Sequence, residues 1–234
     1  MSIRDNYLTI RENMETAAAR AGRSADEVKL IAVTKFVEVE RIAEAIDCGA
    51  DTVGENRVQE LTGKLDFFRS RGVNVNLIGQ LQTNKVKYIV GKVDMIQSVD
   101  RLALAQEIDR LAVKNGVVQD VMIEVNIGEE AQKGGIAPQD LPGFLEMVSA
   151  MNGIRVKGLM CIPPAVGEEE VRPYFARMRT LFETLKVKDL PNVSMEQLSM
   201  GMSGDYMAAI AEGATMIRVG TALFGARQYA VQRT

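Results

Sequence analysis

A lysine closes a short apolar run near the start of the chain, and its amine could do covalent chemistry. The run covers residues 30–34, and Lys35 follows it directly. Apolar side chains on both faces of so short a run predict a buried strand of a parallel sheet. A lysine at the edge of a packed core is partly desolvated, which lowers the pKa of its amine. A neutral amine can condense with an aldehyde or a ketone. The alternative interpretation is that the Lys35 amine is only solvated and has no chemical role.

Two turns rich in glycine and hydroxyl groups, near the end of the chain, could bind an anion. The first contains Ser203, and the second contains Arg218, Gly220 and Thr221. Small residues, hydroxyls and free backbone N–H groups at the start of a helix suit a phosphate group. The alternatives are ordinary glycine turns and, for Arg218, membership of a structural ion pair.

The absence of histidine narrows the possible chemistry. None of the 234 residues is a histidine. This excludes a Ser-His-Asp or Cys-His nucleophile, a histidine-based zinc site and a histidine general base. Covalent or acid–base chemistry must therefore come from Lys, Arg, Tyr, carboxylates or a bound cofactor.

The composition is typical of a cytoplasmic globular protein. With 47% hydrophobic and 25% charged residues, the chain is expected to form one domain over residues 1–234. No apolar run approaches the ~18–20 residues of a membrane span, and the polar start is not expected to be a signal peptide. Cys48 and Cys161 match no metal spacing, which predicts two free thiols in a reducing cytosol. A net charge of −3 gives no support for nucleic-acid binding.

Short apolar runs alternate with amphipathic segments along the whole chain. The runs cover residues 30–34, 52–54, 75–79, 95–99, 121–126, 156–161, 196–200 and 216–220. Helices are predicted over residues 5–21, 38–48, 57–71, 101–114, 141–151, 171–185 and 206–211. Strand and helix alternating eight times predict a single closed parallel (β/α)8 TIM barrel with an extra N-terminal helix. The alternative is an open doubly wound sheet, but no Gly-x-Gly-x-x-Gly follows the first strand.

A barrel would bring the reactive lysine and the two turns together. The active site of such a barrel lies at the carboxyl ends of its strands, and phosphate commonly binds at the loops after strands seven and eight. Closure makes strand eight a neighbour of strand one, about 4.8 Å away. Lys35 and the Gly220-Thr221 turn are therefore expected at the same mouth. A phosphorylated aldehyde could anchor its phosphate on the turns and its carbonyl carbon on Lys35, which fits pyridoxal 5′-phosphate (PLP).

Six segments together carry a family resemblance. They are Ala32-Val33-Thr34-Lys35, Gly54-Glu55-Asn56-Arg57-Val58-Gln59-Glu60, Ile78-Gly79-Gln80-Leu81-Gln82-Thr83-Asn84-Lys85, Gly158-Leu159-Met160, Leu198-Ser199-Met200-Gly201-Met202-Ser203-Gly204-Asp205 and Arg218-Val219-Gly220-Thr221-Ala222-Leu223-Phe224-Gly225-Ala226-Arg227. In these segments the chain resembles the pyridoxal phosphate homeostasis protein family, and the last two are highly specific. The family is similar to the barrel domain of bacterial alanine racemases and eukaryotic ornithine decarboxylases, without their second, β-rich domain.

The resemblance implies roles for particular residues. Lys35 carries PLP as a Schiff base, Asn56 lies close to the cofactor, and Arg218 faces the pyridine nitrogen. The two turns help hold the phosphate. We include Met200 among the cofactor-binding residues, although packing against a helix is the alternative for its side chain. The full set of candidate cofactor-binding residues is Lys35, Asn56, Met200, Ser203, Arg218, Gly220 and Thr221.

One position departs from the family pattern. Many members have a histidine two residues before the Ile-Gly of strand three, where this chain has Asn76. We therefore expect no role for an imidazole at this position, but we still expect the protein to bind PLP.

Arg218 predicts a protein that carries PLP rather than one that turns over an amino acid. PLP catalysis relies on the ring as an electron sink, which works best when an acidic partner keeps its nitrogen protonated. A guanidinium cannot accept that proton, so the ring stays neutral and the sink weak. Racemases with an arginine partner use two well-placed bases, one from the second domain, which this chain lacks. We therefore expect a PLP-binding protein of vitamin B6 homeostasis and supply, with no catalytic residue and no turnover.

Two alternatives remain at this stage. One is a weak PLP-dependent amino-acid racemase or lyase. The other is a Schiff-base aldolase acting on a sugar phosphate, for which Lys157 on strand six is a candidate. The expected partners are PLP and PLP-dependent apo-enzymes, with no metal, nucleic acid or membrane, and the expected state is a monomer or a weak homodimer.

Overall fold

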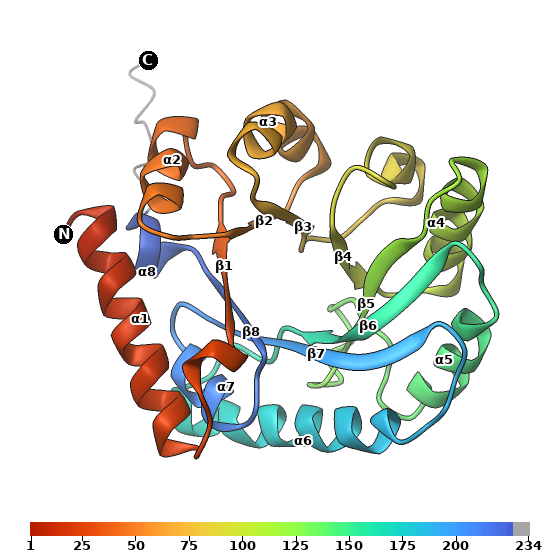
Figure 1. Cartoon of the computed structure of the whole chain (residues 1–234). Helices are drawn as coiled ribbons and strands as arrows, with labels where there is room; N and C mark the ends of the chain where they lie inside the picture. The colour runs from red at the N-terminus through yellow and green to blue at the C-terminus, as the bar shows by residue number, and fades with distance from the viewer. Residues whose placement is uncertain (227–234) are drawn as a thin grey trace.

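Eight parallel strands close into a barrel, which confirms the predicted fold (Figure 1). The computed structural model describes residues 1–226. The strands are β1 (Lys29–Val33), β2 (Thr52–Glu55), β3 (Asn74–Leu77), β4 (Met95–Val99), β5 (Gln119–Val125), β6 (Ile154–Cys161), β7 (Val193–Met202) and β8 (Met216–Val219). Each strand pairs with the next, and β8 pairs in parallel with β1, from Lys29 beside Met216 to Ala32 beside Val219. This last pairing excludes the open doubly wound sheet.

Helices connect the strands on the outside of the barrel (Figure 1). They are α1 (Ile3–Arg20), α2 (Val39–Asp47), α3 (Val58–Arg71), α4 (Leu102–Lys114), α5 (Leu141–Ser149), α6 (Glu168–Lys186), α7 (Tyr206–Ala211) and α8 (Thr221–Phe224), with the 3-10 helices η1 (Ala25–Glu27) and η2 (Thr83–Tyr88). Within residues 1–226, no helix is both long and apolar enough to cross a membrane.

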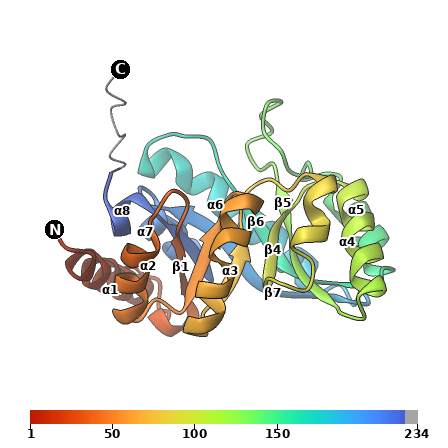
Figure 2. The ribbon, with the colours of Figure 1, turned by 90° about the horizontal axis from the view of Figure 1, so that it is seen from above.

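The extra N-terminal helix covers the side of the barrel where the last helices are short. α7 has six residues and α8 has four, too few to shield the outer face of β7 and β8. α1 packs against α2, α7 and α8, as seen from the side and from above (Figures 1 and 2). Its start is fixed by a capping box, in which Ser2 and Asp5 each bond the other's backbone N–H.

Two connections differ from the predicted pattern. The third crossover contains the 3-10 helix η2, where the alternation predicted a helix without giving its bounds. α6 begins at Glu168 rather than at residue 171. Three glutamates occupy its first turn, where negative charge favours the helix dipole, and the carboxylate of Glu170 accepts from the N–H of Gly167. The apolar periodicity begins only at Val171, which explains the later predicted start.

The interior of the barrel has an apolar and a polar part. Ile31, Met95, Met122, Met160 and Met216 form a cluster separate from the main core. These residues come from five different strands, so they meet inside the barrel. The polar part is a hydrogen-bonded chain of buried side chains from β8, β7, β4 and β3, described below. The polar part links the interior faces of four strands by side-chain hydrogen bonds.

Candidate cofactor-binding site

Strand β1 and the loop after β8 meet at one end of the barrel, which brings Lys35 next to the predicted phosphate loop. Lys35 follows the last residue of β1, Val33, by two positions and is half-buried. Gly220 lies beside the same strand, because a Cβ atom added to it would be 3.4 Å from the Cβ of Val33. The end of β1, which leads into Lys35, therefore lies beside the loop after β8.

The two predicted turns are held together by one hydroxyl. The Oγ of Ser203 accepts hydrogen bonds from the backbone N–H groups of Gly220 and Ala222, each at 3.2 Å. Thr221 lies between them, and its side chain is exposed. The far end of the loop is anchored to α1, since the amide of Asn6 donates to the carbonyl of Leu223 at 2.9 Å. Arg227, the last residue of the motif noted in the sequence, lies outside the described residues.

Arg218 begins a chain of hydrogen bonds that crosses the barrel. Its side chain is buried, and burial lowers the pKa of its guanidinium. It donates to the Oγ of Ser199 at 2.6 Å and to the carbonyl of Cys161 at 2.7 Å. Within residues 1–226 these direct partners are a hydroxyl and a carbonyl rather than a carboxylate. The structure therefore gives Arg218 a fixed orientation without the ion pair considered from the sequence.

The chain of bonds continues to the position where the family pattern has a histidine. Ser199 donates to the Oε1 of Gln97 at 2.7 Å, and the amide of Gln97 donates to the Oδ1 of Asn76 at 3.0 Å. Arg218 can only donate, so the hydrogen bonds run in one direction, from Arg218 through Ser199 and Gln97 to Asn76. Asn76 therefore has a structural place in this chain, at its far end from Arg218.

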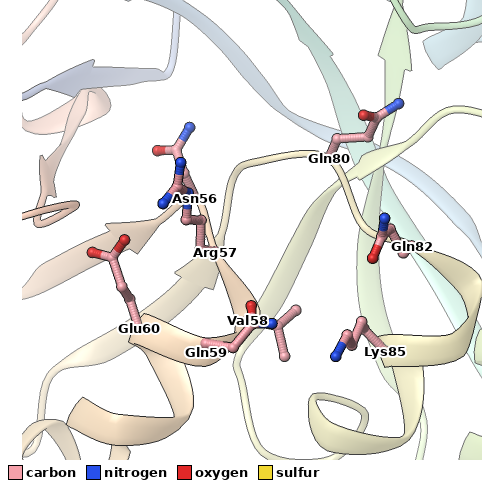
Figure 3. Close-up of a pocket in the computed structure, with 8 residues that line it drawn as sticks. All are labelled: Asn56, Arg57, Val58, Gln59, Glu60, Gln80, Gln82 and Lys85. Atoms are coloured by element: carbon pink, nitrogen blue, oxygen red, sulfur yellow. The ribbon is translucent and has the colours of Figure 1, made fainter.

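Asn56 lies between two cavities at the open end of the barrel. The mouth cavity, of about 320 Å³, is lined by residues that include Asn56, Ile78, Gln80, Asp100, Glu124 and Lys133. The side cleft, of about 490 Å³, has Asn56, Arg57 and Glu60 on one side and Gln80, Gln82 and Lys85 on the other (Figure 3). The Oδ1 of Asn56 is buried without a hydrogen-bond partner among residues 1–226. A ligand in the mouth could supply the missing donor.

Gly79 is required for this placement of Asn56. A Cβ atom at position 79 would lie 2.2 Å from the carbonyl oxygen of Asn56 and 2.7 Å from its Cα. Any side chain would push the two strand ends apart. The Ile-Gly pair of the motif therefore lets the loop after β3 pack against the loop after β2.

Two carboxyl groups in the mouth cavity were missed by the sequence analysis. Burial, and then the negative charge of Asp100, raise the pKa of Glu124 to about 7, although Arg218 acts in the opposite direction. Both carboxyl groups line the mouth cavity. The signal was an acidic residue within an otherwise apolar strand, residues 121–126, since such a residue is rarely buried without a purpose.

Two other candidates lie away from the mouth. Met200 is fully buried in the main hydrophobic core and lines neither cavity, so its side chain packs against the helices and only its main chain can approach a ligand. Lys157 lies in the first half of β6, where its Nζ is 2.6 Å from the carboxylate of Glu196. Its amine is therefore engaged in an ion pair and lies away from the carboxyl end of the strand, so the structure does not favour the aldolase alternative.

Comparison with known proteins gives the same family as the motifs. The profile of the family described as alanine racemase, N-terminal domain, matches residues 6–228. A pyridoxal phosphate homeostasis protein of Aquifex aeolicus is 46% identical over 221 residues, which cover 94% of this chain and 96% of that protein. The protein of the same name from Escherichia coli is 38% identical, and the match covers 97% of both chains.

Two solved structures share the fold over most of their length. A protein of unknown function from Bifidobacterium adolescentis has a TM-score of 0.89 and 36% identity, covering 94% of each chain. PipY of Synechococcus elongatus, solved with PLP bound, has a TM-score of 0.79 and 37% identity, covering 91% of this chain and all of that one. The chain belongs to the pyridoxal phosphate homeostasis protein family, on the barrel of the alanine racemase N-terminal domain.

Proposed function

We propose that this protein binds PLP at the mouth of its barrel, as a Schiff base on Lys35, and serves PLP homeostasis without turnover of its own. The observation that carries the proposal is the meeting of Lys35 with the loop that Ser203 ties to Gly220 and Ala222. An amine and an array of hydroxyl and N–H groups are the two features that a phosphorylated aldehyde needs. The PLP-bound relative and the relatives' shared name support the same ligand.

The residues at the mouth fit this cofactor. When bound, PLP supplies an aldehyde that condenses with an amine, with loss of water, and a ring that can accept electrons. The hydroxyls of Ser203 and Thr221 would hold the phosphate beside Gly220, whose N–H fixes the Ser203 oxygen, with Met200 contributing main-chain atoms. The unpartnered Oδ1 of Asn56 is available to the ligand from the opposite side.

Arg218 supports a carrier rather than an enzyme. Two of its nitrogens donate hydrogen bonds, one to Ser199 and one to the carbonyl of Cys161. These bonds fix the orientation of the guanidinium. Burial lowers the pKa of the Arg218 guanidinium, but arginine keeps its charge in proteins. A guanidinium at the pyridine nitrogen donates a hydrogen bond, but it neither gives the nitrogen a proton nor accepts one from it. The ring would therefore remain a weak electron sink.

The direct test is spectroscopic and chemical. Protein mixed with PLP and dialysed should keep a near-visible absorbance band, and borohydride reduction should fix PLP to the peptide that contains Lys35. The same preparation, given a panel of amino acids, should form no product. PLP fixed to another lysine would contradict the assignment of Lys35, and rapid turnover would contradict the carrier role.

Glu124 favours a second candidate, a weak racemase or lyase. A carboxyl group in the mouth with a pKa near 7 can give or take a proton at neutral pH. The loaded protein would then exchange the α-proton of an amino acid for deuterium, and Glu124→Gln would abolish the exchange. Arg218→Glu, which offers the ring a proton-accepting partner, should increase the exchange if Arg218 is the electronic brake.

A further inference from the structure

A cluster of three charged side chains outside the barrel holds the backbone on both sides of Lys35. Lys64 of α3 donates to the carbonyl of Thr34 at 2.8 Å and to the carboxylate of Glu55 at 2.7 Å. The hydroxyl of Thr34 donates to the same carboxylate oxygen at 2.8 Å. Beyond Lys35, the N–H of Phe36 donates to the carboxylate of Glu60 at 2.8 Å. The residue before the lysine and the residue after it are therefore both bonded to the cluster.

The cluster is continuous, and one part of it is completely buried. The ammonium of Lys64 lies 3.8 Å from the Glu60 carboxylate as well as 2.7 Å from Glu55. The Glu55 side chain has no exposed surface, and its Oε2 has no hydrogen-bond partner within residues 1–226. Burial raises the pKa of Glu55, while the bonds from Lys64 and Thr34 lower it. Buried ion pairs contribute little net stability, so a geometric role is the better account of this one.

The backbone that the cluster holds is strained. Phe36 has a φ of 59°, in the left-handed region that an aromatic residue rarely adopts. Such a conformation is unfavourable and persists only where its surroundings impose it. The Glu60 carboxylate on the Phe36 N–H is one constraint, and the Arg57 guanidinium, 4.8 Å from the centre of the Phe36 ring, is another. Glu60 and Arg57 stand on the same side of the side cleft (Figure 3).

Strand geometry links this strain to the direction of the lysine. Successive side chains of a strand point to opposite faces. Ile31 of β1 belongs to the cluster inside the barrel, whereas Thr34, just beyond the strand, bonds outward to Glu55. Continuing this alternation by one residue directs Lys35 toward the interior. The strand ends at Val33, and the turn at Lys35 and Phe36 keeps the lysine at the rim.

We propose that Glu55, Glu60 and Lys64 form a clamp that fixes the backbone around Lys35 and so directs its amine into the mouth. They are positioning residues, since they act through Lys35 and lie on the other side of β1 and β2 from the mouth. The functional importance of the Lys35 amine rests on the proposed function, but the clamp itself does not depend on it. It gives the Gly54-to-Glu60 motif a second role besides placing Asn56.

The test compares two substitutions at Glu60 with one elsewhere on α3. Glu60→Leu removes the acceptor of the Phe36 N–H, whereas Glu60→Gln keeps an amide oxygen that can accept the same bond. Asp66→Leu is the matched control, because the Asp66 side chain is fully exposed on the same helix. The double variant Glu55→Gln/Lys64→Met removes both charges of the buried Glu55–Lys64 pair together. It provides a second way to release the clamp if Glu60→Leu folds poorly.

Two measurements decide the proposal. In the first, PLP is mixed rapidly with each protein, and growth of the near-visible band gives the rate of covalent attachment. Glu60→Leu and the double variant should attach PLP about tenfold more slowly, because small misplacements of a reacting group cost at least that much. Glu60→Gln and Asp66→Leu should match the parent, and all should show parental circular dichroism. A role in stability alone would leave the rate unchanged.

The second measurement uses no PLP. Trace acetylation of the cofactor-free proteins, followed by peptide mass spectrometry, gives the reactivity of Lys35 relative to an exposed lysine. Released from the clamp, the amine should meet solvent, so its relative acetylation should rise about threefold or more in Glu60→Leu and in the double variant, but not in Glu60→Gln or Asp66→Leu. Parental acetylation in Glu60→Leu, or an equal rise in Asp66→Leu, would overturn the clamp. If the parent attaches no PLP at Lys35, the proposed function fails, while acetylation still decides the clamp.

Discussion

The two sides of the barrel mouth are built differently. On the side of β7, β8 and β1, the polar groups are paired with each other: Ser203 accepts two backbone N–H groups, and Arg218 donates to Ser199 and to a carbonyl. On the side of β4 and β5, Asp100 and Glu124 share a cavity, and the pKa of Glu124 is raised to about 7. One side has its geometry fixed before any ligand arrives. The other keeps a carboxyl group that can change its charge at neutral pH.

This difference suggests a division of labour between holding a cofactor and exchanging it. Pre-formed hydrogen bonds lower the entropy cost of binding, which suits the side that would carry the phosphate and the covalent bond. A carboxyl group near its pKa can accept a proton from an incoming amine, or return one, without leaving a permanent charge in the mouth. Each side can be altered separately by substitution, so the comparison can be tested.

The largest effect is expected from removing the amine on the fixed side. Lys35→Ala should abolish the near-visible band and borohydride-stable labelling, because in the proposed arrangement Lys35 supplies the amine at the end of β1, beside the Ser203–Gly220 loop. The matched control is Lys133→Ala, which removes an amine from the other side of the same mouth. It should keep the band. Loss of the band in Lys133→Ala, with retention in Lys35→Ala, would reverse the assignment of the two sides.

The second prediction concerns the pH response of the other side. In the unfolded chain Glu124 loses its proton near pH 4.5, and in the folded protein near pH 7. The folded state therefore binds more protons between these values, so its stability falls as the pH rises through this window. The loss is about 3 kcal/mol, at about 1.4 kcal/mol for each pKa unit.

Glu124→Gln should remove that loss. Urea unfolding of the parent and the variant at pH 4 and at pH 8 should show the variant gaining about 3 kcal/mol on the parent at the higher pH. Glu146→Gln, at an exposed position on α5, supplies the background pH dependence. A difference between Glu124→Gln and the parent that is independent of pH would mean that Glu124 has the same pKa in the folded and unfolded states, and the contrast between the two sides would disappear.

The fold could be predicted from the sequence because parallel strands buried on both faces leave short, continuous apolar runs. Eight such runs, separated by amphipathic segments, are compatible with two architectures, a closed (β/α)8 barrel and an open doubly wound sheet. The segments that did not match have weak periodicity: residues 83–88 form a 3-10 helix, and the first turn of α6 is entirely acidic. There, hydrogen bonding and the helix dipole, rather than an apolar face, determine the structure.

The candidate site was predictable only where it depends on strand ends. Lys35 and the loops after β7 and β8 follow from their places in a barrel. The Arg218 chain does not, because Ser199 and Gln97 are 102 residues apart and meet only across the closed barrel. Glu124 gave a local signal, an acid within an apolar strand, but its pKa depends on Asp100 from another strand. The clamp around Lys35 likewise depends on α3 packing over β1 and β2.

The third prediction tests how rigid the fixed side is. Ser199→Ala removes the hydroxyl that joins Arg218 to Gln97, and leaves the Gln97 Oε1 and one Arg218 N–H without that partner in a buried place. A buried polar group without a partner costs about 1–3 kcal/mol, so the free energy of unfolding should fall by about 2–3 kcal/mol. Ser70→Ala, on the exposed end of α3, is the control. Parental stability in Ser199→Ala would show that the chain of bonds readily rearranges.

The smallest effect is expected at the exposed edge of the fixed side. Thr221→Val keeps the shape of the side chain but deletes the hydroxyl proposed to bind the phosphate. A hydrogen bond to a charged group contributes about 1.5–3 kcal/mol, and exposure of Thr221 favours the lower value, since water can replace the hydroxyl. Equilibrium dialysis should therefore show PLP binding about tenfold more weakly to the variant. Pyridoxal, which lacks the phosphate, should bind parent and variant alike. If both ligands were weakened equally, Thr221 would act on the shape of the loop after β8, and if neither were, the phosphate would be held by Ser203 and Gly220 alone.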